Sequence, residues 1–223
     1  MNTVGPHRFA DRSAAGSILG ELLAAQGLGS DAVVLGLLRG GVPVAAPIAA
    51  RLGASLGALA VRKLGIPDEP EVAFGAVASY RQHHVVHHVP RIYEYALRRY
   101  SPAILDTVER QASAKLLRLS AAFDAFAPDC AGRTVVLCDD GLATGATMTA
   151  ALRVVSLLGP ASLVVAVPVS PAKVLRELSA YADAVICYSS PPDFSSVGTY
   201  YEDFSQVSEP EILRLIAEFG TKP

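Results

Sequence analysis

Short apolar runs alternate with helical stretches through most of this 223-residue chain, and this alternation constrains the fold more than any other feature. The apolar runs that we interpret as strands are 32–38, 56–61, 134–138, 163–169 and 184–188. Their residues are apolar at consecutive positions, which is typical of strands covered on both faces. Helical patterns at 44–52, 146–158 and 171–180 follow three of them, as right-handed crossovers require. The sequence therefore predicts an α/β fold: a mostly parallel five-stranded sheet with helices on both faces.

Two regions interrupt this alternation. Residues 62–129 are predicted to form an insertion: a loop rich in proline and charge at 62–70, an antiparallel hairpin of 72–79 with 83–89, and a helical pattern over 92–126 that breaks near Ser101-Pro102. Residues 1–27, with an amphipathic helix at 9–26, and the irregular stretch 189–207 are expected to form a small hood. A last helix is predicted at 209–219. We expect residues 1–223 to fold as a single domain.

Composition excludes several classes of function. The net charge of −2 creates no field that would attract nucleic acid, so anions must be bound by local groups. No stretch is apolar for the roughly 18 residues that a membrane helix needs, and the first residues lack an apolar signal core, so we expect a cytoplasmic protein without membrane contact. The three cysteines have no paired metal spacing. Cys138 and Cys187 lie in strand-like runs and are expected to be buried, reduced thiols.

The most informative motif follows the strand 134–138. Asp139 and Asp140 come directly after it, and a turn of small residues with Thr144 and Thr147 leads into the next helix. Adjacent carboxylates accept hydrogen bonds from neighbouring hydroxyls, and N–H groups at a helix start can surround a phosphate. The pattern therefore predicts a site for a phosphorylated sugar. A plain turn with a capping threonine is the alternative, but it leaves unexplained the repulsion within the acidic pair.

This segment resembles the 5-phosphoribosyl-1-pyrophosphate (PRPP) motif of type I phosphoribosyltransferases, in which an apolar strand leads to two acids and then Thr-Gly-x-Thr. The resemblance implies that family's Rossmann-like core. It also implies that Asp139 and Asp140 bind the ribose hydroxyls and that residues 143–147 bind the 5-phosphate. The PRPP-binding residues expected in this segment are Asp139, Asp140, Gly141, Ala143, Thr144, Gly145, Ala146 and Thr147.

Two further segments extend the resemblance. Residues 36–43 look like the family's pyrophosphate loop, in which Arg39, Gly40 and Gly41 would expose N–H groups to the diphosphate and a non-proline cis peptide is often found. Arg62 and Lys63 follow the second predicted strand and would also reach the pyrophosphate. The alternatives are an ordinary turn and a solvated surface pair. The Arg-Lys-x-Gly-x-Pro loop narrows the resemblance to an uncharacterised subgroup of predicted phosphoribosyltransferases.

Motifs at the two ends of the chain are also similar to that subgroup. They are Phe9-x-Asp11-Arg12-x-x-Ala15-Gly16 and Phe194-x-x-Val197-Gly198-x-Tyr200-Tyr201-x-Asp203-Phe204. In this family a variable hood covers the acceptor. Phe194, Tyr200 and Tyr201 are therefore expected to offer rings for a planar acceptor, as could Phe204. The alternative is that these rings only pack the hood.

The resemblance implies a phosphoribosyltransferase that uses PRPP and Mg²⁺, transfers ribose 5-phosphate to a nitrogenous acceptor and releases pyrophosphate. Asp140, Lys63 and Arg39 are the expected catalytic residues. Mg²⁺ is expected to be held mainly by PRPP, with Asp139 and Asp140 as candidate ligands. A homodimer is also expected. Two alternatives stay open: a sensor of PRPP or nucleotides that has lost turnover, and a structural protein that retains only the scaffold.

A histidine cluster lies within the predicted hairpin. On a strand, His83 and His87 share one face while His84 and His88 share the other, at a spacing too wide for easy chelation by either pair. We expect an exposed hairpin here, with zinc or nickel binding as the alternative.

Overall fold

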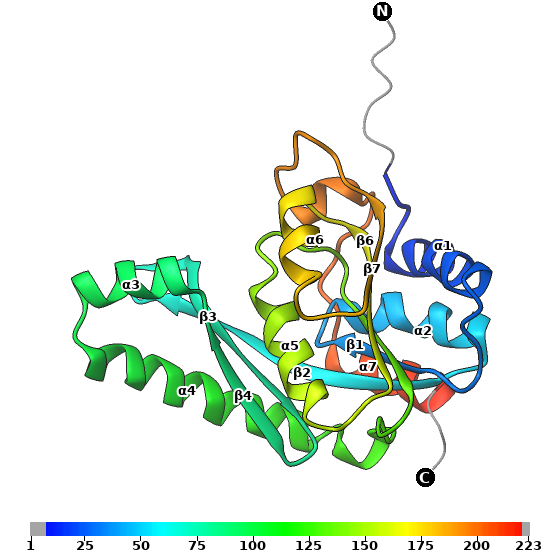
Figure 1. Cartoon of the computed structure of the whole chain (residues 1–223), viewed down its shortest axis with the longest axis horizontal. Helices are drawn as coiled ribbons and strands as arrows, with labels where there is room; N and C mark the ends of the chain where they lie inside the picture. The colour runs from blue at the N-terminus through cyan, green and yellow to red at the C-terminus, as the bar shows by residue number, and fades with distance from the viewer. Residues whose placement is uncertain (1–7, 220–223) are drawn as a thin grey trace, which may run out of the picture.

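The computed structural model describes residues 8–219, and their centre is a seven-stranded sheet with strand order β4-β3-β2-β1-β5-β6-β7 (Figure 1). The strands are β1 (Val33–Leu37), β2 (Ser55–Ile66), β3 (Glu69–Tyr80), β4 (His83–His88), β5 (Thr134–Cys138), β6 (Ser162–Val169) and β7 (Ala184–Ser189). The five strands predicted from the sequence are the neighbours β2, β1, β5, β6 and β7, and they are parallel. The predicted α/β class is confirmed. The sheet has seven strands because β3 and β4 extend it beyond β2 in antiparallel pairing.

Helices cover both faces of this sheet (Figure 1). They are α1 (Arg12–Ala25), α2 (Gly41–Leu52), α3 (Pro90–Arg99), α4 (Pro102–Ala121), α5 (Ala146–Ser156), α6 (Ala172–Leu178) and α7 (Glu209–Phe219), with 3₁₀ turns η1 (Asp124–Phe126) and η2 (Val197–Tyr200). Side chains of α1, α2, α4 and α7 share one hydrophobic cluster with the sheet, and those of α5 and α6 share the other. No helix within residues 8–219 is long and apolar enough to cross a membrane.

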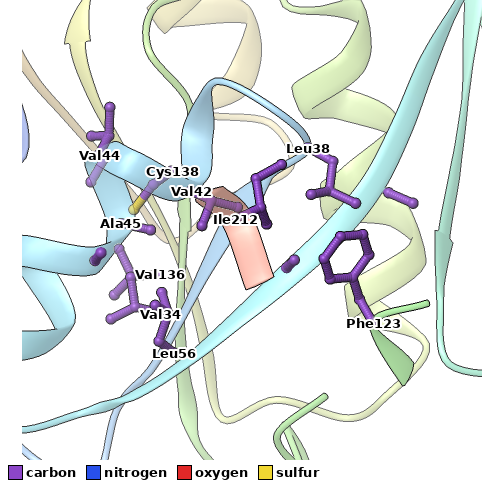
Figure 2. Close-up of a cluster of buried hydrophobic side chains, with 14 of the residues drawn as sticks. Val34, Leu38, Val42, Val44, Ala45, Leu56, Phe123, Val136, Cys138 and Ile212 are labelled. Atoms are coloured by element: carbon purple, nitrogen blue, oxygen red, sulfur yellow. The ribbon is translucent and has the colours of Figure 1, made fainter. Parts of the chain in front are cut away.

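Alternate residues of each central strand belong to opposite clusters. Val34 and Val136 pack on the α2 side, as Figure 2 shows, whereas Leu35 and Leu137 pack on the α5 side. All four side chains are fully buried. This two-sided burial explains why these strands are apolar at consecutive positions.

The second strand is longer than we predicted. Instead of ending at position 61 before a loop, β2 continues to Ile66, turns, and pairs with β3, with Arg62 opposite Val77 and Lys63 opposite Ala76. The proposed loop 62–70 is therefore wrong, because the ladder to β3 satisfies the backbone of a segment whose charge and prolines suggested irregular structure. The predicted helix break is confirmed: α3 ends at Arg99 and α4 begins at Pro102.

The two segments assigned to the hood lie together in space over residues 8–27 and 189–207; the predicted hood residues 1–7 lie outside the described residues. The Phe9 N–H donates to the Tyr200 carbonyl at 2.8 Å, and Phe9 forms a parallel bridge with Tyr201. Phe9, Tyr200, Tyr201, Ala15 and Val169 form a third hydrophobic cluster, separate from the two main ones. This cluster fixes the start of α1 and the η2 segment against the end of β6.

Candidate active site

A cavity of about 460 Å³ opens where β1 and β5 end and β2 passes beside them. Its lining includes nearly all of the residues predicted to bind PRPP: Arg39, Gly40, Arg62, Lys63, Asp139, Asp140, Gly141, Ala143, Thr144, Gly145 and Thr147. The two others, Gly41 and Ala146, are buried at the first positions of α2 and α5. The loops after two parallel strands therefore meet at one place, as the carboxyl edge of such a sheet requires.

The N-terminus of α5 borders the cavity. Gly145 precedes the first helical residue, Ala146, with a φ of 75°, in the left-handed region that favours glycine. Thr144 and Thr147 line the cavity on either side of this turn. The first N–H groups of a helix have no acceptor within it, so this terminus offers donors and a positive dipole end to an anion.

The acidic pair occupies the middle of the cavity, and its charge is poorly solvated. Burial raises the pKa of Asp139 well above the usual carboxyl range, and the charge of Asp140 raises it further. Burial also raises the pKa of Asp140, although a hydrogen bond from Arg12 opposes this effect. The Asp140 N–H donates to the Asp139 carboxylate at 2.9 Å. Two carboxylates in this setting are suited to a ligand that donates hydrogen bonds to both.

The loop after β1 packs directly against this acidic pair. A methyl group at Gly41 would lie 3.1 Å from Asp139 Cα, and one at Gly40 would overlap the Asp140 carboxylate. Glycine at both positions therefore lets the two loops approach each other. The Leu38–Arg39 peptide is cis, as the resemblance led us to expect for this loop.

Three basic side chains also line the cavity. Arg39, Arg62 and Lys63 are all exposed, and none of them forms an ion pair with another residue between 8 and 219. Arg62 and Lys63 extend from β2 itself and not from a loop after it, so the backbone beneath them is held in a ladder. Positive charge that lacks a protein partner is available to an anionic ligand.

Sequence reasoning missed Arg12, although the residue lies in a motif that carried the resemblance. Its Nε donates to Asp140 Oδ2 at 2.8 Å, across 128 positions of sequence. Val197 and Phe204 of the hood also line the cavity. A pairing between such distant positions leaves no local pattern. The only signal available in the sequence was the presence of Arg12 and Phe204 in the two end motifs.

The predicted acceptor rings lie mostly in the interior of the hood. Tyr200 and Tyr201 are 5% and 3% exposed, and Tyr200 stacks on Phe194 with ring centroids 5.7 Å apart. The Tyr201 hydroxyl donates to the Asp140 carbonyl at 2.6 Å. None of the three rings lines the cavity, whereas Phe204 does. The structure thus supports packing as the role of these three rings.

The described residues contain no group of three or more His, Cys, Asp or Glu side chains that could hold a metal ion. Asp139 and Asp140 nevertheless offer neighbouring carboxylate oxygens, the type of donor that Mg²⁺ prefers. Such a pair fits an ion held mainly by the oxygens of a ligand and not by a protein cage.

The histidine cluster belongs to β4 and is largely half-buried, not exposed as we expected, because α4 and α5 pack nearby. His88 contacts Glu109 at 2.9 Å and stacks on Tyr93, while His84 contacts Ser113 on α4. These contacts give the imidazoles a structural role. The three cysteines are free thiols; Cys130 and Cys138 are buried and Cys187 is half-buried. Burial raises the pKa of Cys187 to about 11.

Comparisons with known proteins agree with this geometry. The family described as "Phosphoribosyl transferase domain" matches residues 13–203. Two Mycobacterium tuberculosis proteins, each named "Putative phosphoribosyl transferase" (MT0597 of strain CDC 1551 and Rv0571c of strain H37Rv), are 40% identical over 210 residues. The match covers 93% of this chain and 46% of each relative, so the chain spans about half the length of these proteins.

Solved structures share the fold of this chain. The crystal structure of TT1426 from Thermus thermophilus has a TM-score of 0.75 and 41% identity, covering 96% of this chain and all of that one. The AQ2163 protein from Aquifex aeolicus has a TM-score of 0.50 at 13% identity, with 79% of this chain and 73% of that chain covered, and shows a shared fold alone. By its sequence match and its fold, the chain belongs to the phosphoribosyltransferase family.

Proposed function

We propose that this protein binds PRPP with Mg²⁺ and transfers its ribose 5-phosphate to a nitrogenous acceptor, releasing pyrophosphate. One observation carries the proposal. Basic side chains from β2 and the β1 loop, an acidic pair after β5 and the N-terminus of α5 all line the same cavity. These three features are complementary, in that order, to a diphosphate, a ribose diol and a terminal phosphate.

The position of PRPP follows from this complementarity. The 5-phosphate is assigned to Ala143 through Thr147, where the helix dipole and the two threonine hydroxyls favour an anion. The ribose hydroxyls donate to Asp139 and Asp140. The pyrophosphate is assigned to Arg39, Gly40 and Lys63, with Arg62 beside them.

In the proposed reaction, the nitrogen lone pair of the acceptor attacks the anomeric carbon of PRPP. The bond from that carbon to the pyrophosphate oxygen breaks, its electron pair leaves with pyrophosphate, and the configuration inverts. The role of Arg39 and Lys63 is to stabilise the charge that develops on the leaving group. Magnesium, when bound with PRPP, neutralises part of this charge. Asp140 is the candidate base for a proton on the acceptor nitrogen, and its raised pKa brings it closer to the range a base requires.

The hood side of the cavity is assigned to the acceptor. Val197 and Phe204 line the cavity there, and Phe204 is 38% exposed, so its ring is accessible for contact. This position moves the proposed acceptor contact from the predicted rings at 194, 200 and 201 to Phe204. We also keep the homodimer as a proposal, which sedimentation velocity would test.

Calorimetry with PRPP and Mg²⁺ tests the proposed binding. We expect heat from the wild-type protein and none from the Asp139→Asn, Asp140→Asn double variant. Each substitution replaces one hydrogen-bond-accepting carboxylate oxygen by an NH2 group, which only donates, and removes the negative charge. Equal heat from both proteins would refute the assigned site. Pyrophosphate release measured against a panel of bases and small amines then tests turnover. Binding without release for every acceptor would favour the sensor of PRPP over the enzyme.

A further inference from the structure

Arg12 links the hood to the acidic pair. The side chain starts at the first residue of α1 and ends beside Asp140, with Nε 2.8 Å from Asp140 Oδ2. Its Nη1 donates to the carbonyl of Ser205 at 2.8 Å. Its guanidinium lies over the Phe204 ring, 4.0 Å from the ring centroid. Three separate contacts therefore fix one side chain.

This ion pair differs from the others in its burial. The side chains of Arg12 and Asp140 are 12% and 15% exposed, whereas Arg51 and Glu21, which link α2 to α1, are 48% and 67% exposed. An exposed pair contributes little because water competes for both charges. In a largely buried pair, the loss of one partner leaves the other charge uncompensated. Removal of Arg12 should therefore perturb Asp140 more than removal of Arg51 perturbs Glu21.

The position of Asp140 depends on groups from several elements. Asp139 adds negative charge from the same loop, and Lys63 on β2 lines the same cavity and adds positive charge near Asp139. Tyr201 holds the Asp140 carbonyl, but it does not touch the carboxylate in any contact between described residues. Among residues 8–219, Arg12 is the side chain that hydrogen-bonds the Asp140 carboxylate, and it engages Oδ2.

We propose that Arg12 is a positioning residue: from the hood, it orients the Asp140 carboxylate and balances its charge so that the carboxylate can accept a ribose hydroxyl. The inference rests on the proposed function, because it assigns the diol to this carboxylate. It also gives the link between the two hood segments a role, since Ser205 and Phe204 in the segment 189–207 both contact Arg12 at the start of α1.

Ligand fragments separate this role from a purely structural one. Ribose 5-phosphate contains the diol, whereas inorganic pyrophosphate contains only the part assigned to Arg39 and Lys63. For Arg12→Gln we expect affinity for ribose 5-phosphate to fall about tenfold or more, the scale of a hydrogen bond to a charged group, while affinity for pyrophosphate stays at the wild-type value. General damage to the fold would weaken both fragments together.

Arg51→Gln is the matched control, because it makes the same substitution in an ion pair that also involves α1 but lies outside the cavity. It should bind both fragments as the wild type does. Arg12→Lys keeps the positive charge, so it should lose less affinity for ribose 5-phosphate than Arg12→Gln does. A lysine cannot reach both Asp140 and Ser205 as the guanidinium fork does, so it should still bind ribose 5-phosphate more weakly than the wild type. If Arg12→Gln does not fold, the affinities of Arg12→Lys for the two fragments still test the inference.

Three results would overturn the inference. One is wild-type affinity of Arg12→Gln and Arg12→Lys for ribose 5-phosphate. Another is tighter binding by these variants, which would make Arg12 a competitor of the ribose and not its support. The third is equal weakening of both fragments. If the wild-type protein binds neither ribose 5-phosphate nor PRPP, the proposed function fails as well, which distinguishes that failure from a failure of the role of Arg12 alone.

Discussion

Replacement of Gly145 by alanine should damage stability and phosphate binding together. The residue has a φ of 75°, and an added Cβ would lie 2.9 Å from Val174 Cγ1. The left-handed backbone costs alanine about 1–2 kcal/mol, partly offset by about 0.4–1 kcal/mol from a less flexible unfolded chain. Val174 is 6% exposed and stiff about χ1, so it cannot easily move aside. Overpacking of this kind adds about 1–3 kcal/mol.

We therefore expect Gly145→Ala to lower the free energy of unfolding by about 1–5 kcal/mol, the net of those backbone and packing effects. For a chain of this size that corresponds to a fall in Tm of roughly 2–20 °C. Urea unfolding and calorimetry measure the two quantities. PRPP binding should weaken as well, because the shifted turn displaces the N–H groups at the start of α5.

Gly159→Ala is the control for the backbone effect. Gly159 has a φ of 64°, and an added Cβ would meet nothing within 4 Å. Its substitution should cost only about 1 kcal/mol and leave PRPP binding unchanged. If Gly145→Ala costs no more than Gly159→Ala, the contact with Val174 does not constrain the turn. If it binds PRPP as tightly as the wild type, the start of α5 is not the phosphate site.

Three further variants test the surroundings of this turn. Tyr201→Phe removes the hydrogen bond to the Asp140 carbonyl and should destabilise the protein by about 1–3 kcal/mol in urea unfolding; an unchanged midpoint would contradict this. Lys63→Gln should weaken pyrophosphate binding several-fold and reduce its salt dependence, whereas Lys173→Gln, in an exposed pair on α6, should do neither in the same titration. Because the folded pKa of Asp139 is raised, the ligand-free protein should lose stability as pH rises from about 3.8 through that raised pKa, and Asp139→Asn should show a smaller decline in urea unfolding, since only the raised pKa of Asp140 would remain; parallel pH profiles would refute the assignment.

The part of the fold that could be predicted is the part determined by local pattern. The strands β1, β5 and β6 are short apolar runs covered on both faces, and β7 is a half-buried run at the sheet edge; all four stand out from the polar turns between them. The turn before α5 could also be predicted, since residue types and spacing within one short segment indicate its conformation, and its proposed phosphate chemistry rests on the same segment. The structure places those residues around one cavity.

The extension of β2 could not be read in the same way. Arg62 and Lys63 are polar and prolines follow, so local propensity favours a loop. What holds the segment extended is its partner β3, with Leu64 paired to Gly75 and a bulge beyond that pair. Pairing with another strand overrode local preference here. As a consequence, two basic side chains of the cavity, those of Arg62 and Lys63, extend from hydrogen-bonded strand residues and not from a loop.

The different roles of the aromatic residues in the hood could not be predicted from the sequence alone. Tyr201 and Phe204 are aromatic residues three positions apart, yet one is buried against Phe9 and the other faces the cavity. What separates their roles is Arg12, which covers one side of Phe204 while it holds Asp140. A guanidinium, a ring and a carboxylate from three distant segments form this unit, and no periodicity or spacing encodes it. The residue pattern that suggested PRPP lies within one short segment, whereas the proposed acceptor side of the cavity depends on how both ends of the chain fold together. The acceptor is therefore best sought with variants of Arg12 and Phe204, where the hood meets the proposed sugar site.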